Sequence, residues 1–427
     1  MGKVKVLTAR QAADLIKDGD TVTLSGFVAN GIAEALNTAA EERFLETGHP
    51  KDLTLFWVAG TGNKDGSHAD HYAHEGMVKK VIGGHFNFVP KICEMLSENK
   101  IEGYNVPQGA IAQMLRDNAA RKVGTISHVG IGTFADPRNG GGRLSEKTKE
   151  DIVKIIELEG QEQLFYPRIP LDVAFIRGTY ADELGNITLE KEMAPLDATS
   201  QAMAVHNNGG LVVVQVERVV KAGHLDPKLV KIPGIYVDAV VECPADDPKQ
   251  SQSINCTYDP AYAGNTQVPV SSLEPKKLDA KKIIGRRAAM ELKKNVVVNL
   301  GVGVPEWVSS VAAEEGVADE MTLTVECGPV GGVPGGGLRF GGSVNAQAYM
   351  DEGYQFDFYD GGGLDLCFLG LAEVDNNGDV NVSRLGTRIT GSGGFTNISS
   401  NSKKAVFCGT FTNGVKIQTG DGKLTIL

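Results

Sequence analysis

MTLTVECGPVGGVPGGGLRFGG, residues 321–342, is the stretch from which the rest of the chain is interpreted. Its apolar residues Met321, Leu323 and Val325 alternate with threonines, which predicts a short buried strand that ends at Glu326. The residues that follow are mostly glycine and proline, so the backbone there can approach a ligand closely and offer it N–H groups. The pattern therefore predicts one carboxylate at a strand tip facing a loop of backbone donors, which suits covalent catalysis at a carbonyl.

Two simpler interpretations compete with a nucleophilic Glu326. A single glutamate after a strand is most often a solvated turn residue. The neighbouring Cys327 carries the better nucleophile, but a thiol needs a base or a helix N-terminus to ionise, and no histidine lies nearby in the sequence. The local sequence alone leaves all three interpretations open.

Length and composition bound the classes of protein that this chain can belong to. Its 427 residues are enough for two or three domains, and its net charge of −11 argues against a general nucleic-acid or anionic-membrane binder. No segment reaches the ~20 apolar residues of a membrane helix, and the N-terminus lacks a secretory signal, so we expect a cytoplasmic protein. The six cysteines are widely spaced with no C-x-x-C pair, as expected of reduced, mostly buried thiols.

Three pairs of segments, in the same order in both halves of the chain, indicate an internal duplication. Residues 10–28 match 286–304, residues 52–62 match 320–330, and residues 172–189 match 365–382, the last pair aligning Asp172 with Asp365 and Asp182 with Asp375. Together with the many glycine turns, the repeat predicts two α/β domains of one fold, each with a mostly parallel sheet. Glu326 aligns with Val58, so the fold itself does not require a carboxylate there, and this favours a function for Glu326.

The repeat also predicts the domain boundaries. We expect the first domain at residues 1–243, a linker rich in Pro, Ser, Asn and Asp at 244–279, and a second domain carrying Glu326 at 280–427. The second domain lacks a counterpart to one segment of the first, and the chain stops soon after an apolar stretch at 403–411. We therefore expect the second domain to be shortened.

Several glycine turns add candidate backbone donors. They lie in GVGVPEW (301–307), YDGGGLDL (359–366) and GSGGFTNIS (391–399), and the candidate ligand contacts within them are Gly301, Val302, Gly303, Gly361, Gly362, Gly393 and Gly394. Each turn is also explained by tight packing against a strand, although their concentration in the half that carries Glu326 favours binding of an anionic group. In YNVPQGA (104–110), Gln108 can donate an amide hydrogen bond to a substrate oxygen or simply cap a turn.

The segment HADHYAHEG, residues 68–76, has the spacing H-x-x-H-x-x-H, which resembles a cluster of metal ligands. On a helix, however, residues three and then six apart drift off one face, and the H-E-x-x-H motif is absent. We therefore favour a polar segment near the site entrance or the domain surface, and we expect no metal.

TLTVECGPVGGVPGGG, the block YDGGGLDLCFLGLAEVDNNGDVNVSR and GSGGFTNIS resemble the family I CoA-transferases, in particular the propionate/acetate CoA-transferases that fuse both half-subunits in one polypeptide. The resemblance extends over nearly the full chain. It implies two homologous open α/β domains in tandem, with Glu326 as the nucleophile and Gln108 as the family's P-Q-G glutamine. It also implies that the GVGVP and GSGG turns contact CoA or form an oxyanion hole. Related fused proteins usually continue beyond the position of Leu427, which again predicts a shortened chain.

The resemblance further implies a ping-pong reaction between a short-chain acyl-CoA and a free carboxylate. Glu326 attacks the acyl-CoA carbonyl, giving an acyl-glutamyl anhydride and CoA thiolate, and the thiolate then forms a glutamyl-CoA thioester as the first acid leaves. CoA is then a co-substrate, no other cofactor is expected, and the assembly is expected to be a homodimer or homotetramer. The sequence does not choose among propionate, acetate, lactate and butyrate. An acyl-CoA hydrolase and a non-catalytic acyl-CoA or sugar-phosphate binding protein remain the alternatives, although a binder has no reason to place a carboxylate against an anionic ligand.

Overall fold

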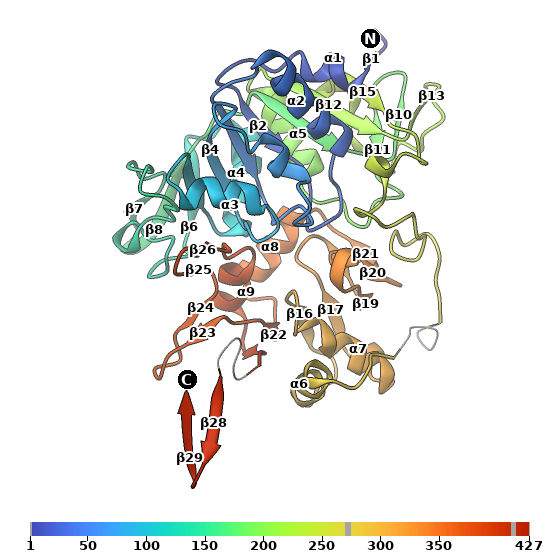
Figure 1. Ribbon diagram of the computed structural model, residues 1–427. Coiled ribbons are helices and arrows are strands. Elements are labelled where there is room, and N and C mark those ends of the chain that lie inside the picture. Colours follow the sequence, from blue (N-terminus) through green and yellow to red (C-terminus); the bar gives the residue numbers. More distant parts are fainter. Residues whose placement is uncertain (1, 270–274, 411–415, 427) are drawn as a thin grey trace.

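The computed structural model describes residues 2–269, 275–410 and 416–426. Figure 1 shows the N-terminal half above the C-terminal half, with the hairpin of β28 (Ile417–Gly420) and β29 (Lys423–Ile426) extending from the lower end. Each half is built around its own sheet with helices packed against it, so the molecule has two α/β layers of similar design.

The first sheet has eight strands in the order β1-β15-β12-β9-β2-β3-β4-β5, and all of its pairings are parallel. The strands are β1 (Lys5–Leu7), β2 (Thr21–Leu24), β3 (Leu53–Trp57), β4 (Val78–Gly83), β5 (Glu102–Asn105), β9 (Val173–Arg177), β12 (Leu211–Val216) and β15 (Ala239–Glu242). The helices of this half are α1 (Ala9–Ala13), α2 (Glu34–Thr47), α3 (Pro90–Ser97), α4 (Gln108–Ala119) and α5 (Ala198–Asn207). Two small sheets complete it: β13 (Arg218–Val220), β10 (Tyr180–Asp182), β11 (Ile187–Thr188) and β14 (Val230–Ile232) form one, and β6 (Gly124–Ser127), β8 (Gln161–Pro167) and β7 (Lys154–Leu158) form the other.

Successive side chains along a strand of the first sheet point to opposite faces and pack into two separate hydrophobic cores. Val173 and Phe175 of β9 belong to the cluster packed by α1, α2 and α3, whereas Ala174 and Ile176 belong to the cluster packed by α4 and α5. Burial on both faces explains why these strands are continuous apolar runs rather than alternating ones, as is usual for parallel sheets covered by helices.

The second sheet has six strands in the order β21-β18-β17-β16-β22-β27. The strands are β16 (Val297–Leu300), β17 (Thr322–Thr324), β18 (Pro329–Val330), β21 (Ala348–Tyr349), β22 (Leu366–Leu369) and β27 (Ala405–Phe407), and the helices of this half are α6 (Ala280–Ala289), α7 (Glu306–Glu314), α8 (Glu352–Asp360) and α9 (Phe395–Asn401). Short two-stranded ladders pair β19 (Val333–Pro334) with β20 (Ser343–Val344), β23 (Glu373–Val374) with β24 (Val380–Asn381), and β25 (Arg384–Leu385) with β26 (Arg388–Ile389). β17 pairs parallel with β16 but antiparallel with β18.

The predicted strand before Glu326 exists but ends two residues earlier. β17 stops at Thr324, and the N–H of Gly328 donates to the carbonyl oxygen of Val325 at 3.0 Å, closing a tight turn that reverses the chain into β18. Glu326 therefore lies inside this turn. The residues expected to form one continuous loop also contain β18 and β19, which is a correction to that expectation.

The internal duplication is confirmed by the structure. β9-β2-β3 in the first sheet and β22-β16-β17 in the second are matched segments, adjacent in the same order and parallel. Asp172 accepts the N–H of Thr21 at 2.8 Å, and its counterpart Asp365 accepts the N–H of Val297 at 2.9 Å. The two α/β domains of one fold follow from this shared pattern.

The two halves are held together by a shared apolar cluster. It contains Phe27, Ala59 and Leu196 from the first half with Val325 and Phe340 from the second. The segment predicted as a linker is packed rather than free, because the Arg177 guanidinium donates to the carbonyl oxygens of Gln250 and Ser251. The boundaries at 243 and 279 stay a prediction, with part of the segment (270–274) outside the described residues.

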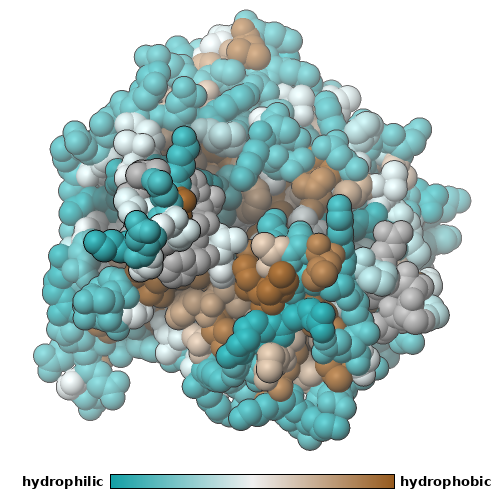
Figure 2. All heavy atoms as spheres, turned by 60° about the horizontal axis from the view of Figure 1, so that its bottom comes forward, coloured by the Kyte–Doolittle hydropathy of each residue, from teal (hydrophilic) through white to brown (hydrophobic). Residues whose placement is uncertain are grey.

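The lower end of the molecule is turned forward in Figure 2, which shows apolar side chains near the middle of this face with polar ones around them. Exposed apolar residues of the C-terminal half include Ile283, Met290 and Phe407, and a groove of about 480 Å³ runs between α6 and β27.

β27 is the last strand on its side of the sheet, so its outer edge is unpaired within the described residues. Among those residues, no helix combines the length and the apolar character needed to cross a membrane.

Candidate active site

A cavity of about 270 Å³ lies between the two halves, where the carboxyl ends of their parallel strands face each other. The first half contributes Phe27, Val28, Gly60, His85, Phe88 and Gln108. The second half contributes Gly301, Val302, Glu326, Leu369 to Ala372, Val382, Thr390 to Phe395 and Ile398. Six of the candidate site residues line this one cavity: Glu326, Gln108, Gly301, Val302, Gly393 and Gly394.

Glu326 is 6% exposed and is the only carboxyl among the described residues that line the cavity. Burial raises the pKa of Glu326 to about 7, opposed by Asn299, whose Nδ2 lies 3.5 Å from Oε2 of the carboxylate. Behind it, the hydroxyl of Tyr359 donates to Thr324 Oγ1 at 2.8 Å and receives a hydrogen bond from Asn299 at 3.2 Å. A weakly solvated carboxylate held this way is a stronger nucleophile than one in water, and it is ionised in a large fraction of molecules at neutral pH.

Cys327 does not share this environment. It is fully buried in the cluster between the halves, and its thiol donates to the carbonyl oxygen of Gly341 at 3.1 Å. Burial raises the pKa of the Cys327 thiol well above its usual value. The thiol therefore stays protonated and outside the cavity, which favours Glu326 over its neighbour.

Gln108 is the first residue of α4, and its side chain is 2% exposed. Its Nε2 donates to Glu352 Oε1 at 2.5 Å, and its backbone N–H donates to the carbonyl oxygen of Gly393 at 3.1 Å. The sequence suggested that the Gln108 amide is free to donate to a substrate. In the structure, the amide lies between the cavity and the buried carboxyl of Glu352, to which it already donates one hydrogen bond. One N–H of the amide remains for a substrate oxygen.

Only some of the predicted glycine turns have N–H groups left for a ligand. The N–H groups of Gly301 and Gly393 donate to the carbonyl oxygens of Phe368 and Gly84, both at 2.8 Å. The N–H groups of Val302 and Gly394 have no hydrogen-bond partner within the described parts of the chain. Val302 and Gly394 are therefore the stronger candidates for holding an oxyanion.

Three predicted contacts are not brought to the cavity. Gly361 and Gly362 end α8, and their N–H groups donate to the carbonyl oxygens of Asp357 and Tyr359. Gly303 donates its N–H to Glu306 Oε1 at 2.7 Å in the turn that leads into α7. These glycines serve tight turns at helix ends, which is the simpler alternative that the sequence had left open.

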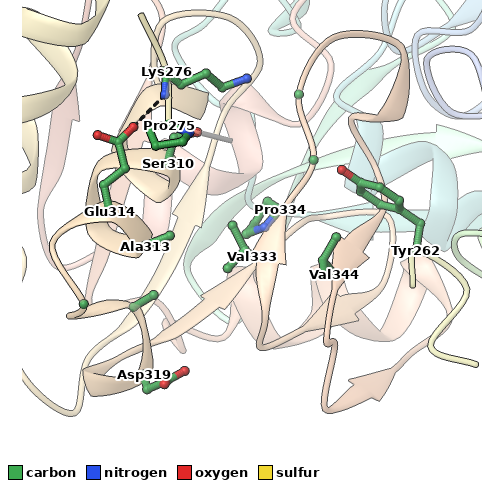
Figure 3. A pocket seen from close by; sticks show the side chains of 14 residues that line it. Tyr262, Pro275, Lys276, Ser310, Ala313, Glu314, Asp319, Val333, Pro334 and Val344 are labelled. Carbon is green, nitrogen blue, oxygen red and sulfur yellow. Dashed lines mark hydrogen bonds between the residues drawn. The ribbon is translucent and has the colours of Figure 1, made fainter. Parts of the chain in front are cut away.

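The glycine loop after Glu326 also faces elsewhere than expected. Gly335 and Gly336 line a separate cavity of about 750 Å³, drawn in Figure 3, where Tyr262 lies on one side and Lys276 on the other. The backbone N–H of Lys276 donates to Glu314 Oε1 at 2.7 Å there. Glu326 is not among the residues lining this larger space, and among the described residues the hydrogen bond to its carboxylate comes from Asn299 rather than from this loop.

His85 is a cavity residue that the sequence analysis missed. His85 is partly exposed, and burial of its imidazole lowers the pKa of His85 to about 4 and keeps the ring neutral. Its Nδ1 has no hydrogen-bond partner in the described structure. The sequence did contain a signal for His85, because the paired glycines Gly83 and Gly84 place this histidine at the carboxyl end of the strand β4.

The histidine-rich segment forms a structural cluster. His68 lies in the 3-10 turn His68–Tyr72, and burial lowers the pKa of its imidazole to about 3. His71 contacts Glu34 and Glu41 of α2 at 2.7 and 2.5 Å, and His74 contacts Glu41 at 2.7 Å. Much of the segment is buried against α2 and none of its histidines lines the cavity, contrary to the expected position near the site entrance or the domain surface. No group of three potential metal-binding side chains occurs in the described residues.

Comparison with known proteins gives a consistent set of matches. A family model described as Coenzyme A transferase matches residues 6–243. Acetate CoA-transferase YdiF of Escherichia coli (strain K12) is 44% identical over 430 residues, covering 100% of this chain and 80% of that protein. Caffeate CoA-transferase of Acetobacterium woodii is 42% identical over 427 residues, covering 99% of this chain and 81% of that protein.

Solved structures match over the same extent. The YdiF apoenzyme of Escherichia coli O157:H7 superposes with a TM-score of 0.90 at 42% identity, covering 100% of this chain and 80% of that one. A thioester complex of the same protein with CoA matches equally well. The fold found here, with both halves in one chain, is therefore that of these structures.

Proposed function

This chain belongs to the coenzyme A transferase family, and from that premise we propose that Glu326 carries CoA as a glutamyl thioester between a short-chain acyl-CoA and a free monocarboxylate. The enzyme transfers CoA, which is a co-substrate rather than a bound cofactor. One observation carries the proposal: the cavity between the halves has a single lining carboxyl within the described structure, and it is buried and weakly solvated.

The first step of the first half-reaction uses the ionised form of Glu326. Its oxygen attacks the acyl-CoA carbonyl, and the tetrahedral intermediate collapses to an acyl-glutamyl anhydride and CoA thiolate. The N–H groups of Val302 and Gly394, with the remaining N–H of Gln108, are the donors proposed to stabilise the oxyanion.

The second step of the same half-reaction retains the leaving thiolate in the cavity. The thiolate attacks the glutamyl carbonyl of the anhydride, the first carboxylate leaves, and a glutamyl-CoA thioester remains until a second carboxylate reverses the sequence. Each step replaces one anionic leaving group by another, carboxylate for thiolate or thiolate for carboxylate, so no proton has to be gained or lost. Because the first acid leaves before the second enters, the kinetics are ping-pong.

The mechanism is tested by the intact mass of the protein after incubation with propionyl-CoA. We expect the mass of one CoA, as a thioester, to appear on the wild-type chain, to be lost on borohydride reduction, and to map by peptide fragmentation to Glu326. Accumulation of this adduct without an acceptor also distinguishes a transferase from a hydrolase. The control is Cys327→Ala, which should still form the adduct because the thiol lies outside the cavity. Loss of the adduct in that variant would refute the assignment.

The acyl group is proposed to be uncharged. The lining is largely apolar, with Phe27, Phe88, Phe395 and Ile398, and it contains no lysine or arginine among the described residues. A second carboxylate on the substrate would lose its hydration without gaining a cation, which costs several kcal/mol. Short monocarboxylates such as propionate, acetate, lactate and butyrate fit this lining.

Substrate selectivity follows from that missing cation. We expect kcat/KM for propionyl-CoA to exceed that for succinyl-CoA by at least about 100-fold, which corresponds to roughly 3 kcal/mol. Leu371 lines the cavity at a partly exposed position, and Leu371→Arg should raise kcat/KM for succinyl-CoA. The propionyl-to-succinyl ratio of kcat/KM should therefore become smaller. Leu371→Met is the matched control and should leave the ratio in place. Equal use of both substrates by the wild-type enzyme would contradict an apolar acyl site.

The cellular compartment and the oligomeric state of the enzyme are proposals. All six cysteines are free thiols in the structure, which supports a reducing, cytoplasmic compartment. A homodimer or homotetramer is the assembly we propose, on the resemblance to the family alone.

A further inference from the structure

We propose that Glu352 and Asp197 form a buried pair that holds one shared proton, and that this pair positions Gln108 in the active site. The proposal concerns two residues that lie outside the cavity lining, and it rests on the proposed role of Glu326. It assigns them a positioning role, because neither touches the cavity itself.

The geometry of the pair spans both halves of the molecule. Glu352 opens α8 in the second half, is 1% exposed, and donates its backbone N–H to the carbonyl oxygen of Leu196 at 3.0 Å. Asp197 precedes α5 in the first half and is 6% exposed. Their carboxyl groups are in hydrogen-bonding contact, while Glu352 also accepts the amide of Gln108 at 2.5 Å.

Hydrogen-bond accounting requires a proton between the two carboxyl groups. Ionised carboxylates are acceptors only, and two of them in contact repel each other in a buried site. No N–H or O–H group of the described residues donates to Oδ1 or Oδ2 of the Asp197 carboxyl group. A proton on Glu352 resolves both problems, because the acid O–H can donate to Asp197 while the other oxygen of Glu352 accepts from Gln108.

The charged surroundings of the pair favour keeping this proton. Burial raises the pKa of Asp197 to about 7 and that of Glu352 well above its usual value, and the negative charge of Glu326 adds to the effect on Glu352. Asp351 acts in the same direction on Asp197, and Arg116 opposes it. Arg116 is itself paired with Asp357 at 2.6 Å, and Asp351 lies 3.6 Å from Lys231, so the nearby cations are already engaged.

The consequence for catalysis is an alkaline limit. While the proton is held, the pair carries one negative charge and anchors one N–H of Gln108, leaving the other for the substrate. When the proton is lost, a second charge appears beside Glu326, where thiolate and carboxylate anions must form, and the pair separates. We therefore expect kcat to fall at high pH because Glu352 loses the shared proton.

Glu352→Gln provides the decisive variant, because glutamine mimics the protonated acid and cannot ionise. Wild-type kcat should fall at least about fivefold between pH 8 and pH 10, and the fall in Glu352→Gln should be less than about twofold. Glu352→Ala removes the anchor of Gln108 and should lower kcat about 10- to 100-fold with less than threefold change in KM. Asp70→Asn, which changes a buried carboxyl remote from the cavity, is the control and should keep the wild-type profile.

The acid side of the profile gives an independent readout. Glu326 must be ionised, so kcat/KM should rise with pH towards a plateau above its pKa of about 7. Glu352→Gln should leave this limb in place, because it replaces a neutral acid by a neutral amide. A shift of the acid limb to lower pH in Glu352→Gln, or an alkaline fall like that of wild type, would overturn the shared proton.

Failure of this proposal and failure of the proposed function give different results. The glutamyl-CoA adduct is measured by mass in the wild-type enzyme and in each variant, and thermal unfolding reports whether each variant is folded. An absent adduct in the folded wild-type enzyme refutes the role of Glu326. A normal adduct with identical pH profiles in wild type and Glu352→Gln refutes only the pair.

Discussion

Glu326→Gln is expected to lower kcat by at least about 10⁴-fold, because it removes the attacking oxygen and with it every covalent intermediate. Glutamine has the shape of the carboxyl and can still accept the weak hydrogen bond of Asn299, so binding of CoA should change less than about threefold. The measurement combines steady-state kinetics with calorimetric titration of CoA. Glu326→Asp tests placement: its carboxylate is one methylene shorter and should recover only a small part of the rate.

The same substitution should stabilise the folded protein at alkaline pH. The folded-state pKa of Glu326, about 7, lies above the usual value of 4.5, so ionisation of Glu326 disfavours folding increasingly between these two values and fully above the higher one. Glu326→Gln removes that cost, which is roughly 2 to 4 kcal/mol at pH 8 and small at pH 4. Activity at the wild-type level in this variant, or an equal stability change at both pH values, would contradict a buried nucleophilic carboxylate.

Gly328→Ala is expected to destabilise the C-terminal half by more than about 3 kcal/mol and to displace Glu326. Gly328 closes the turn that contains Glu326, with φ of 135°, a conformation that residues with a Cβ rarely adopt. A Cβ atom at this position would lie 2.2 Å from the carbonyl oxygen of Met350, which is backbone and cannot move aside cheaply. Both the turn and the neighbouring strand would have to shift.

Gly337→Ala is the matched control in the same stretch of sequence. Gly337 also has a positive φ, of 62°, but a Cβ atom there would meet nothing within 4 Å. Gly337→Ala should therefore lower the free energy of unfolding by only about 1 to 2 kcal/mol, which is the cost of the left-handed backbone conformation alone. Urea unfolding followed by circular dichroism compares the two variants, and the glutamyl-CoA adduct reports whether Glu326 is still in place. Equal stability of the two variants would show that close packing at Gly328 does not hold the turn.

The sequence predicted the fold well because the relevant signals are local and repeated. Apolar runs and glycine turns recur in the two halves, and each recurrence corresponds to a strand of the same sheet order. The counterparts Asp172 and Asp365 even make the same hydrogen bond to a neighbouring strand. The same comparison singled out Glu326 as a candidate, since it breaks a repeat whose surroundings are kept.

The glycine turns were harder to interpret because their sequences do not say where their N–H groups point. Gly393 and Gly362 lie in similar glycine-rich contexts, yet Gly393 reaches the cavity and Gly362 ends a helix. Even at the cavity, the N–H of Gly393 is used by Gly84, a residue of the other half. Hydrogen-bond partners so far apart in the chain leave no mark on local sequence.

The sequence by itself determined the two-fold repeat and the strand that leads to Glu326, and it led to the proposal that this carboxylate is the nucleophile. Only the tertiary structure decided that Glu326 is buried with a raised pKa, that Cys327 faces a core, that His85 lines the cavity, and that Gln108 is bound to Glu352. The first group depends on residue periodicity within a few turns of chain. The second depends on which surfaces of the two halves meet, because solvation, charge and hydrogen-bond partners at the site are supplied by residues hundreds of positions away.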